Sequence, residues 1–531
     1  MKTNHLLIAI LLFATQLLLA CSAPAAAALA VPPDMQSGDL TALKECEYKA
    51  QGDNTKYRAE CGTLAVPENW DVPGSRLIAL PVVRIPASGP NPAEPVFRLA
   101  GGPGGTNLSW EPPEWLLQKH DVVLVGYRGV DGSVVLSCPE ITSQEKAHLG
   151  KEFWSEQASK EYAAGAKQCA ARFQAAGVDL SGYSIPGVVG DMEAARVALG
   201  YDKINLFSES YGTRVAQIYA YMKPDSLHRV VQVGVNTPGH FIFDPAILDT
   251  QIRYLSKLCA QDAACSSRTS DLAQTIYTVN HNMPQRWLFL TIDSDTIRLG
   301  SQFLLAVNQN VGTVVDAYLA AAHGDPSGLA LANLLTTLMF NPDTQILGEY
   351  FSVGASTDRE KYGGKESISL GDSIMGAPLS ELIWPMAVDW PVDLIPKELR
   401  ELQDTDVEML LVNGTLDVAT PATDMDEAKA YFHKAQMVLL PEFSHVGDEY
   451  TLQPKAWERL ITSYYDTGVA DNSLYVYQPV SFQPAMNTPL LAKLLVAAMI
   501  LVPTLVIFAV VLVVRRIRRR RASKKLAGVT A

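Results

Sequence analysis

The sequence predicts an α/β fold in which helices cover both faces of a mostly parallel sheet, with an inserted helical lid and a C-terminal transmembrane helix. Short, continuously apolar runs alternate with longer helical stretches in the first half of the chain and again near its end. Such runs are typical of strands that are buried on both faces, as in parallel sheets. The alternation stops over residues 241–400, which are mostly helix-like, and the apolar segment 490–514 is long enough to cross a bilayer.

The predicted strands define two halves of a core, residues 45–240 and 401–470. An antiparallel pair opens the first half, at 64–66 and 77–85. Further strands are expected before the lid at 95–100, 121–127, 203–207 and 229–235, and after it at 407–412 and 436–440. Helices are expected in the lid at 245–260, 300–322 and 327–339. The segment 241–400 is therefore predicted to be an insertion in one α/β domain.

The first 21 residues have the pattern of a secretory signal. A short polar start is followed by an apolar run over residues 6–20, which ends in Leu-Leu-Ala-Cys21. This ending resembles a bacterial lipobox, in which Cys21 would become the lipidated first residue. Ordinary cleavage in the Ala-rich stretch 23–30 is the alternative. Residues 22–44 are predicted to be a linker.

The C-terminal part is predicted to form a stalk at 471–489, the membrane helix at 490–514 and a tail at 515–531. Basic residues follow the apolar segment at once, namely Arg515, Arg516, Arg518, Arg519, Arg520, Arg521, Lys524 and Lys525. Positive charge at the end of a membrane helix indicates the cytoplasmic side. We therefore expect a cell-membrane protein with an extracytoplasmic catalytic domain and a cytoplasmic tail.

The net charge of −13 is the sum of a basic contribution from the two ends of the chain and an acidic contribution from the part between them. Residues 1–21 and 490–531 hold ten of the 43 basic residues and no acidic one. The remaining 33 basic and 56 acidic residues give residues 22–489 a net charge of −23. An acidic domain of this kind argues against nucleic-acid binding, which requires a basic surface.

Six cysteines remain when Cys21 is set aside: Cys46, Cys61, Cys138, Cys169, Cys259 and Cys265. An even number in an exported chain indicates disulfides, because the compartment is oxidising. Six cysteines allow 15 connectivities, of which the three neighbouring pairs are the simplest. We see neither a C-x-x-C pair nor a His/Cys cluster, so no metal site and no cofactor are predicted.

Ser210 is the predicted nucleophile. The sequence Ser208-Glu-Ser210-Tyr-Gly212 lies between an expected strand and a helix at 213–222, which is the position of a nucleophile elbow. The usual first glycine of G-x-S-x-G is Ser208 here, another small residue. By itself the motif is common, and a surface turn is the alternative. The strand–turn–helix context favours the nucleophile.

In α/β proteins with this elbow, the catalytic residues occur along the chain in the order serine, acid, histidine. This order identifies candidates for the general base and for its acid. Of the nine histidines, only His433 and His445 come late enough, and His433 lies in an expected helix at 422–433. His445 lies in the loop after the last strand, where an imidazole can take and return the serine proton. Asp417 lies at the carboxyl end of the preceding strand and is the predicted acid. The other nearby acids precede that strand or belong to the next helix: Asp404, Asp406, Asp424 and Asp426.

Two backbone amides are predicted to form the oxyanion hole. Tyr211 follows the nucleophile, and Gly102 belongs to the loop Gly101-Gly-Pro-Gly-Gly105 after an early strand. Glycines let the backbone turn inward without a side chain in the way. A phosphate loop is the alternative, but the Lys-Ser/Thr of a P-loop and the third spaced glycine of a dinucleotide site are absent from this stretch of sequence.

Several motifs in this order resemble the proline-iminopeptidase and tripeptidyl-aminopeptidase branch of the α/β-hydrolases, over roughly residues 45–465. They are Cys61-Gly-Thr-Leu-Ala-Val-Pro, Leu-Ala-Gly-Gly-Pro-Gly-Gly, Gly126-Tyr-Arg-Gly-Val-Asp-Gly-Ser, Gly190-Asp-Met-Glu-Ala-Ala-Arg, Ser-Glu-Ser-Tyr-Gly and Gly414-Thr-Leu-Asp-Val-Ala-Thr-Pro. The resemblance implies an α/β-hydrolase fold and a serine exopeptidase that acts on free N-termini under a helical lid. It points to the same Ser210, Asp417 and His445. The family's usual histidine before Gly-Gly-Pro-Gly is Ala100 here, which leaves the substrate open.

An exopeptidase needs an anion to hold the substrate ammonium. The lid has many carboxylates, including Asp244, Asp249 and Glu349, and none of them is singled out by the sequence. Glu209, beside the nucleophile, is a substrate-binding candidate, with a role in the turn as its alternative. The functions to separate are a membrane-tethered aminopeptidase that acts on peptides with free N-termini, an esterase or lipase of the same fold, and an inactive binding module. The oligomeric state is left open.

Overall fold

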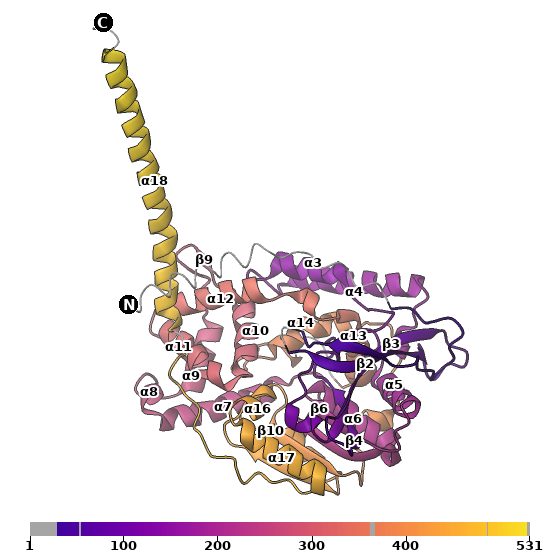
Figure 1. Ribbon diagram of the computed structural model, residues 1–531. Coiled ribbons are helices and arrows are strands. Elements are labelled where there is room, and N and C mark those ends of the chain that lie inside the picture. The colour runs from indigo at the N-terminus through magenta and orange to yellow at the C-terminus, as the bar shows by residue number, and fades with distance from the viewer. Residues whose placement is uncertain (1–28, 52–54, 362–366, 486, 528–531) are drawn as a thin grey trace.

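A computed structural model describes residues 29–51, 55–361, 367–485 and 487–527, with side chains up to Arg519 in the last helix. The predicted signal at 1–21, including the lipidation site Cys21, lies outside the described residues. Figure 1 shows a body that combines a twisted sheet with a helical region, from which one long helix projects.

The body is built on a nine-stranded sheet with the order β1-β2-β3-β5-β4-β6-β7-β10-β11. β1 (Lys44–Tyr48), β2 (Tyr57–Pro67) and β3 (Leu77–Ile85) are antiparallel to their neighbours. The parallel part comprises β5 (His120–Val125), β4 (Ala93–Leu99), β6 (Ile204–Glu209), β7 (Leu227–Val233), β10 (Met409–Gly414) and β11 (Ala435–Leu440). Every expected strand is present, and β1 is an additional one.

Each face of the sheet carries its own hydrophobic core, which explains the continuous apolar runs. In β5, Val123 and Val125 pack on one side, while Val122 and Leu124 pack on the other. Alternate residues of a strand point to opposite faces, so a strand covered on both faces is mostly apolar along its length. The covering helices include α5 (Ile185–Ala198) and α6 (Tyr211–Met222) on one face, and α2 (Glu114–Leu117) and α17 (Pro454–Thr467) on the other. The predicted α/β-hydrolase fold is confirmed.

The segment between β7 and β10 is helical, as the sequence predicts. Its main helices are α7 (Pro245–Gln261), α9 (Leu272–His281), α10 (Ser294–Leu305), α11 (Val311–Ala322), α12 (Ser327–Met339), α13 (Leu347–Asp358) and α14 (Pro378–Ala387). A hairpin of β8 (Arg286–Trp287) and β9 (Leu290–Thr291) was not expected. The helices α3 (Pro139–His148) and α4 (Glu156–Ala175) come from the first half of the core but pack against this region.

One helix prediction in the lid was wrong. The stretch 300–322 is divided between α10 and α11, with a 3-10 turn at Asn308–Asn310 between them. The backbone N–H of Asn308 donates to Asp448 at 3.0 Å, and its side-chain amide donates to the carbonyl of Glu442 at 2.6 Å. These contacts with the loop around His445 replace helical hydrogen bonds. Because they join distant parts of the chain, no local sequence pattern predicts them.

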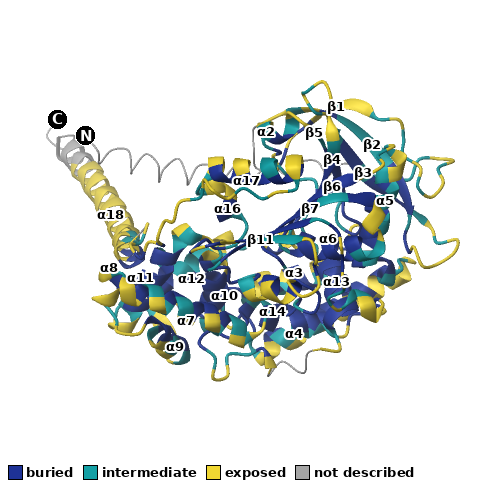
Figure 2. Cartoon of the chain, turned by 90° about the horizontal axis from the view of Figure 1, so that it is seen from below, coloured by how far each residue is buried: buried dark blue, intermediate teal, exposed yellow. Residues whose placement is uncertain are grey.

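The last helix, α18 (Thr488–Ala527), is long and apolar enough to cross a membrane over Thr488–Arg519. Figure 2 shows it exposed along nearly its whole described length. It begins against the lid, where Ala492 and Val496 are buried. The preceding segment runs along the body rather than standing free, since Val480 and Phe482 are buried there. The basic tail continues the same helix to residue 527.

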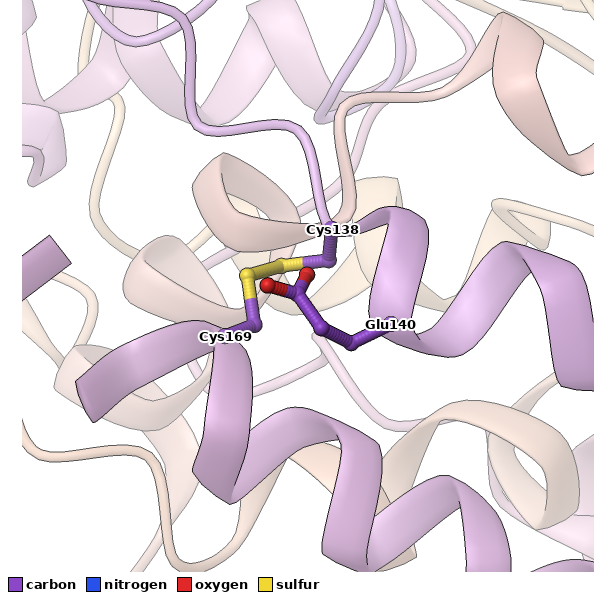
Figure 3. A group of neighbouring side chains, drawn as sticks. All are labelled: Cys138, Glu140 and Cys169. Atoms are coloured by element: carbon purple, nitrogen blue, oxygen red, sulfur yellow. A yellow bond between two sulfur atoms is a disulfide. The ribbon is translucent and has the colours of Figure 1, made fainter. Parts of the chain in front are cut away.

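Three disulfides join the neighbouring cysteine pairs: Cys46–Cys61, Cys138–Cys169 and Cys259–Cys265. Figure 3 shows Glu140 beside the second of these. Because both sulfurs are bonded to each other, they are not available as thiolate ligands. The Glu140 carboxylate accepts a hydrogen bond from Arg172 at 2.6 Å, so its partner is a guanidinium.

Candidate active site

Ser210 lies in a strained turn between β6 and α6. Its φ of +50° and ψ of −123° are rare for a residue with a side chain, and such strain clusters at active sites. Its backbone N–H donates to the carbonyl of Val233 at 2.9 Å, which ties the turn to β7. A side chain on Gly212 would come within 2.1 Å of the carbonyl oxygen of Leu99. Glycine is therefore required for α6 to start so close to β4.

The structure also explains the serine at the first position of the elbow. Ser208 is fully buried, and its hydroxyl donates to the carbonyl of Val231 at 2.8 Å. A small side chain that makes its own hydrogen bond fits where glycine is usual, because it leaves no unsatisfied polar atom.

The fully buried Asp417 and the partly exposed His445 form a pair at the carboxyl end of β10. The Nδ1 atom of His445 is 2.8 Å from Oδ2 of Asp417. The other carboxylate oxygen accepts backbone N–H bonds from Ala419 and Thr420, both at 2.8 Å, and the Thr420 hydroxyl donates to Oδ2. These bonds fix the carboxylate and hold the imidazole so that Nε2 is left for the nucleophile.

Ser210 and the Asp417–His445 pair both lie against the end of β7. A Cβ on Gly234 would lie 3.0 Å from Cε1 of His445, so the imidazole lies against this glycine. The preceding residue, Val233, accepts the hydrogen bond from Ser210. Ser210, Asp417 and His445 therefore follow the parallel strands β6, β10 and β11, and β7 lies between the first two of these in the sheet. The rejected candidate His433 is half-exposed and lies near Asp404 and Asp406 instead.

Two opposing effects act on the pKa of His445. Burial lowers it, but the charge and hydrogen bond of Asp417, together with the charges of Glu209 and Asp448, outweigh burial and raise the pKa above its ordinary value. A raised pKa makes the imidazole a stronger base. This suits a group that must accept a hydroxyl proton and then donate it.

The glycine loop after β4 lies over the nucleophile. A Cβ on Gly101 would be 3.1 Å from Cβ of Ser210. The loop is held from below by Asn107, whose oxygen accepts from the Ala100 N–H at 2.8 Å and whose amide donates to the carbonyls of Arg98 and Val125. The predicted oxyanion donors, Gly102 and Tyr211, flank this place. Asn107 carries no motif of its own, so no sequence pattern predicts it.

Glu349 from the lid helix α13 is bonded to the same loop. Its Oε2 accepts a hydrogen bond from the Gly104 N–H at 2.5 Å, and its side chain is almost fully buried. Burial raises its pKa to about 8, although the bond from Gly104 acts in the opposite direction. No Lys, Arg or His of the described residues forms an ion pair with it. A lid carboxyl thus reaches the loop that covers the nucleophile.

Glu209 has a cationic partner inside the protein. Its carboxylate forms a buried ion pair with Arg98 of β4, whose guanidinium also lies over the rings of Trp110 and Phe207. Because the neighbouring guanidinium balances its charge, Glu209 is less suited to hold an external cation. Its role as a substrate-binding residue stays a prediction.

Comparison with known proteins agrees with this geometry. The family model described as "alpha/beta hydrolase fold" matches residues 94–250, and the one described as "TAP-like protein" matches residues 380–473. The chain is an α/β-hydrolase of the tripeptidyl-aminopeptidase-like branch. The two matched segments contain all three residues of the predicted triad.

Relatives of this α/β-hydrolase are distant. The chain is 24% identical to a tripeptidyl aminopeptidase of Streptomyces lividans over 346 residues, which cover 61% of each protein. It is 28% identical to the serine protease Hip1 of Mycobacterium tuberculosis over 194 residues, 34% of this chain and 36% of that one. The match thus spans about three fifths of the first relative's length.

Solved structures match the chain only at low similarity. An esterase, RhEst1, from Rhodococcus sp. ECU1013 is 12% identical, with a TM-score of 0.34, 80% of this chain covered and 98% of that chain. A thermophilic esterase from Thermogutta terrifontis is 11% identical, with a TM-score of 0.33 and the same coverage. Similarity at this level gives no information about the substrate.

Proposed function

We propose that the protein is an extracytoplasmic, membrane-tethered serine aminopeptidase that acts on peptides with free N-termini. The observation that carries this proposal is the Asp417–His445 contact of 2.8 Å beside the strained Ser210, under a glycine loop. The names of the relatives, a tripeptidyl aminopeptidase and a serine protease, support peptides as the substrate class.

The reaction proceeds in two steps on Ser210. Its Oγ attacks the scissile carbonyl carbon while Nε2 of His445 takes the hydroxyl proton, and the N–H groups of Gly102 and Tyr211 stabilise the oxyanion. His445 then gives the proton to the leaving amine, which leaves an acyl-enzyme. Water, activated by the same imidazole, attacks the acyl carbon, and the ester bond to Oγ breaks. Asp417 stabilises the imidazolium in both steps.

Glu349 is our candidate for the anion that recognises the substrate N-terminus. It is buried, lies beside the loop over Ser210 and has no cationic partner among the described residues. An ammonium placed beside it would favour the ionised carboxylate and complete an ion pair. A free N-terminus supplies such a cation, whereas an acetylated N-terminus does not.

One assay separates the three candidate functions. We expect the full-length protein to cleave free-N-terminus peptide amides and to lose this activity when the same peptides are N-acetylated. Fast hydrolysis of p-nitrophenyl acyl esters with slow cleavage of every peptide would instead identify an esterase. A fluorophosphonate probe should label the protein and fail to label Ser210→Ala. If the folded wild-type protein is not labelled, it is a binding module and the proposal fails.

A further inference from the structure

The lid contains an apolar cavity that the proposed reaction does not use. It has a volume of about 500 Å³ and lies between α10, α11 and α12. Most of its lining is apolar, including Phe303, Val314, Leu329, Leu335 and Met339. No Asp, Glu, Lys, Arg or His of the described residues lines it. Such a cavity offers no partner for the ends of a peptide and suits an uncharged, apolar chain.

Large apolar side chains are exposed on α10 and α12, which line the cavity, and on the β8–β9 hairpin, which packs against α12; two of them, Phe303 and Met339, line the cavity itself. We call them the lid rim: Leu288, Phe289, Phe303, Leu338 and Met339. Leu338 and Met339 are 70% and 78% exposed, and the other three are each at least half exposed. Soluble proteins rarely expose apolar side chains in groups, and groups of this kind mark interaction surfaces.

The cavity is adjacent to the start of the apolar helix. Thr488, the first residue of α18, lines the cavity. The helix is fixed there by an ion pair of 2.6 Å between Lys493 and Asp325, and by Gly328, where a Cβ would come within 2.8 Å of the Thr488 hydroxyl. Figure 1 shows α12, β9 and α3 on the side of the lid from which α18 leaves.

The membrane boundary follows from the length of α18. About 20 apolar residues span the hydrocarbon core, so counting back from Arg515 places its near edge close to residue 495. Thr488 precedes that point by seven residues, a distance of about 10 Å along a helix. The end of the cavity at Thr488 therefore lies close to the lipid head groups.

We propose that this cavity binds an acyl chain of a phospholipid from the leaflet that faces the lid. The proposal rests on the membrane tethering by α18 proposed above. The chain would enter between the residues of the lid rim and lie along α10 and α12, where it removes apolar side chains from water. The bilayer is the occupant that the position favours, because α18 holds the cavity beside it.

The test uses the full-length protein in nanodiscs of phosphatidylethanolamine and phosphatidylglycerol, doped with a phospholipid that carries a diazirine near its acyl terminus. After irradiation, mass spectrometry locates the labelled peptides. We expect label in residues 296–318 and 327–340 as well as in α18. Ala332→Trp, which fills the cavity, should lower the lid label at least fivefold and leave the α18 label unchanged. Met339→Asp, at the exposed rim, should act in the same direction without disturbing the core.

Val197→Trp is the matched control, because Val197 is 61% exposed on α5 and does not line the cavity. Fluorophosphonate labelling of Ser210 reports folding independently of lipid binding. Lipid label in α18 without label in the lid overturns the proposal. The proposal also fails if Ala332→Trp and Met339→Asp both leave the label in the lid unchanged. Absence of label in α18 itself would refute the tethering, while peptide cleavage reports the catalytic proposal separately.

Discussion

The Oε2 atom of Glu349 lies 2.5 Å from the backbone nitrogen of Gly104, so a lid side chain is bonded directly to the loop over the nucleophile. The lid makes a second such contact on the opposite side of the site, where the N–H of His445 donates to the carbonyl of Ala306 at 3.0 Å. Movement of the lid would therefore displace both the glycine loop after β4 and His445.

The first prediction concerns the stability that depends on Glu349. Its pKa in the folded protein is raised to about 8, so the folded state retains a proton that the unfolded chain loses near pH 4.5. The stabilisation is complete below pH 4.5 and is lost as the pH rises to 8, by at most about 1.4 kcal/mol per pH unit. Glu349→Gln should flatten this dependence, measured by urea unfolding at pH 5, 6.5 and 8.

Other buried acids also carry raised pKa values, so the comparison must be between the two proteins at each pH. Glu145, whose pKa is raised to about 7 by burial, provides the matched control variant Glu145→Gln, because it lies on α3. Identical slopes for wild type and Glu349→Gln would contradict the proton assignment at Glu349. In activity assays, Glu349→Gln should raise KM for free-N-terminus peptides, whereas Glu145→Gln should not.

The second prediction concerns the acid of the triad. Asp417→Asn should lower kcat by about 10⁴-fold, because the imidazole loses both its orientation and the charge that stabilises its cation. The residual activity should have its acidic limb at lower pH, since Asp417 raises the pKa of His445. Asp406→Asn, at an exposed acid near His433, is the control and should behave as wild type. A normal rate for Asp417→Asn would remove Asp417 from the mechanism.

The third prediction concerns Asn107, and it separates an effect on the position of the glycine loop from an effect on the stability of the whole protein. Asn107→Ala removes the bonds to Ala100, Arg98 and Val125 and should lower kcat by about 10²-fold as the oxyanion donors lose their positions. Asn205→Ala is the matched control, because Asn205 is also buried and bonds the carbonyl of Glu94, but at the start of β6. Both variants should lose about 1–3 kcal/mol of stability. Equal losses of kcat would show that Asn107 acts only through folding.

The fourth prediction tests the ion pair beside the nucleophile. Arg98→Met leaves the carboxylate of Glu209 buried without its partner and should destabilise the protein by about 3–5 kcal/mol. Adding Glu209→Gln should recover much of that loss, because the uncompensated charge is gone. Thermal unfolding of the two single variants and the double variant gives the coupling free energy between Arg98 and Glu209. If Glu209→Gln alone also abolishes the preference for free over acetylated peptides, then Glu209, rather than Glu349, holds the ammonium.

Much of the candidate catalytic arrangement could be predicted from the sequence, because it depends on the order of strands and loops along the chain. Strands that are buried on both faces have continuous apolar sequences. The residues at the carboxyl ends of parallel strands lie at one edge of the sheet. Ser210, Asp417 and His445 each follow such a run, so chain order predicts their roles, and these roles stay predictions. The expectation of one helix over 300–322 failed because the turn at Asn308 is set by contacts with Asp448 and Glu442.

The sequence by itself determined most of the elements, the candidate triad and the apolar C-terminal helix, whereas the tertiary structure decided which cysteines pair. Only the tertiary structure decided which acids are paired and which are not, since an ion pair such as Arg98–Glu209 joins residues that are far apart in the chain. It also decided that Glu349 reaches Gly104 and that an uncharged cavity lies against the start of α18. These relationships arise from packing between distant segments, which leaves no periodic pattern in any one of them.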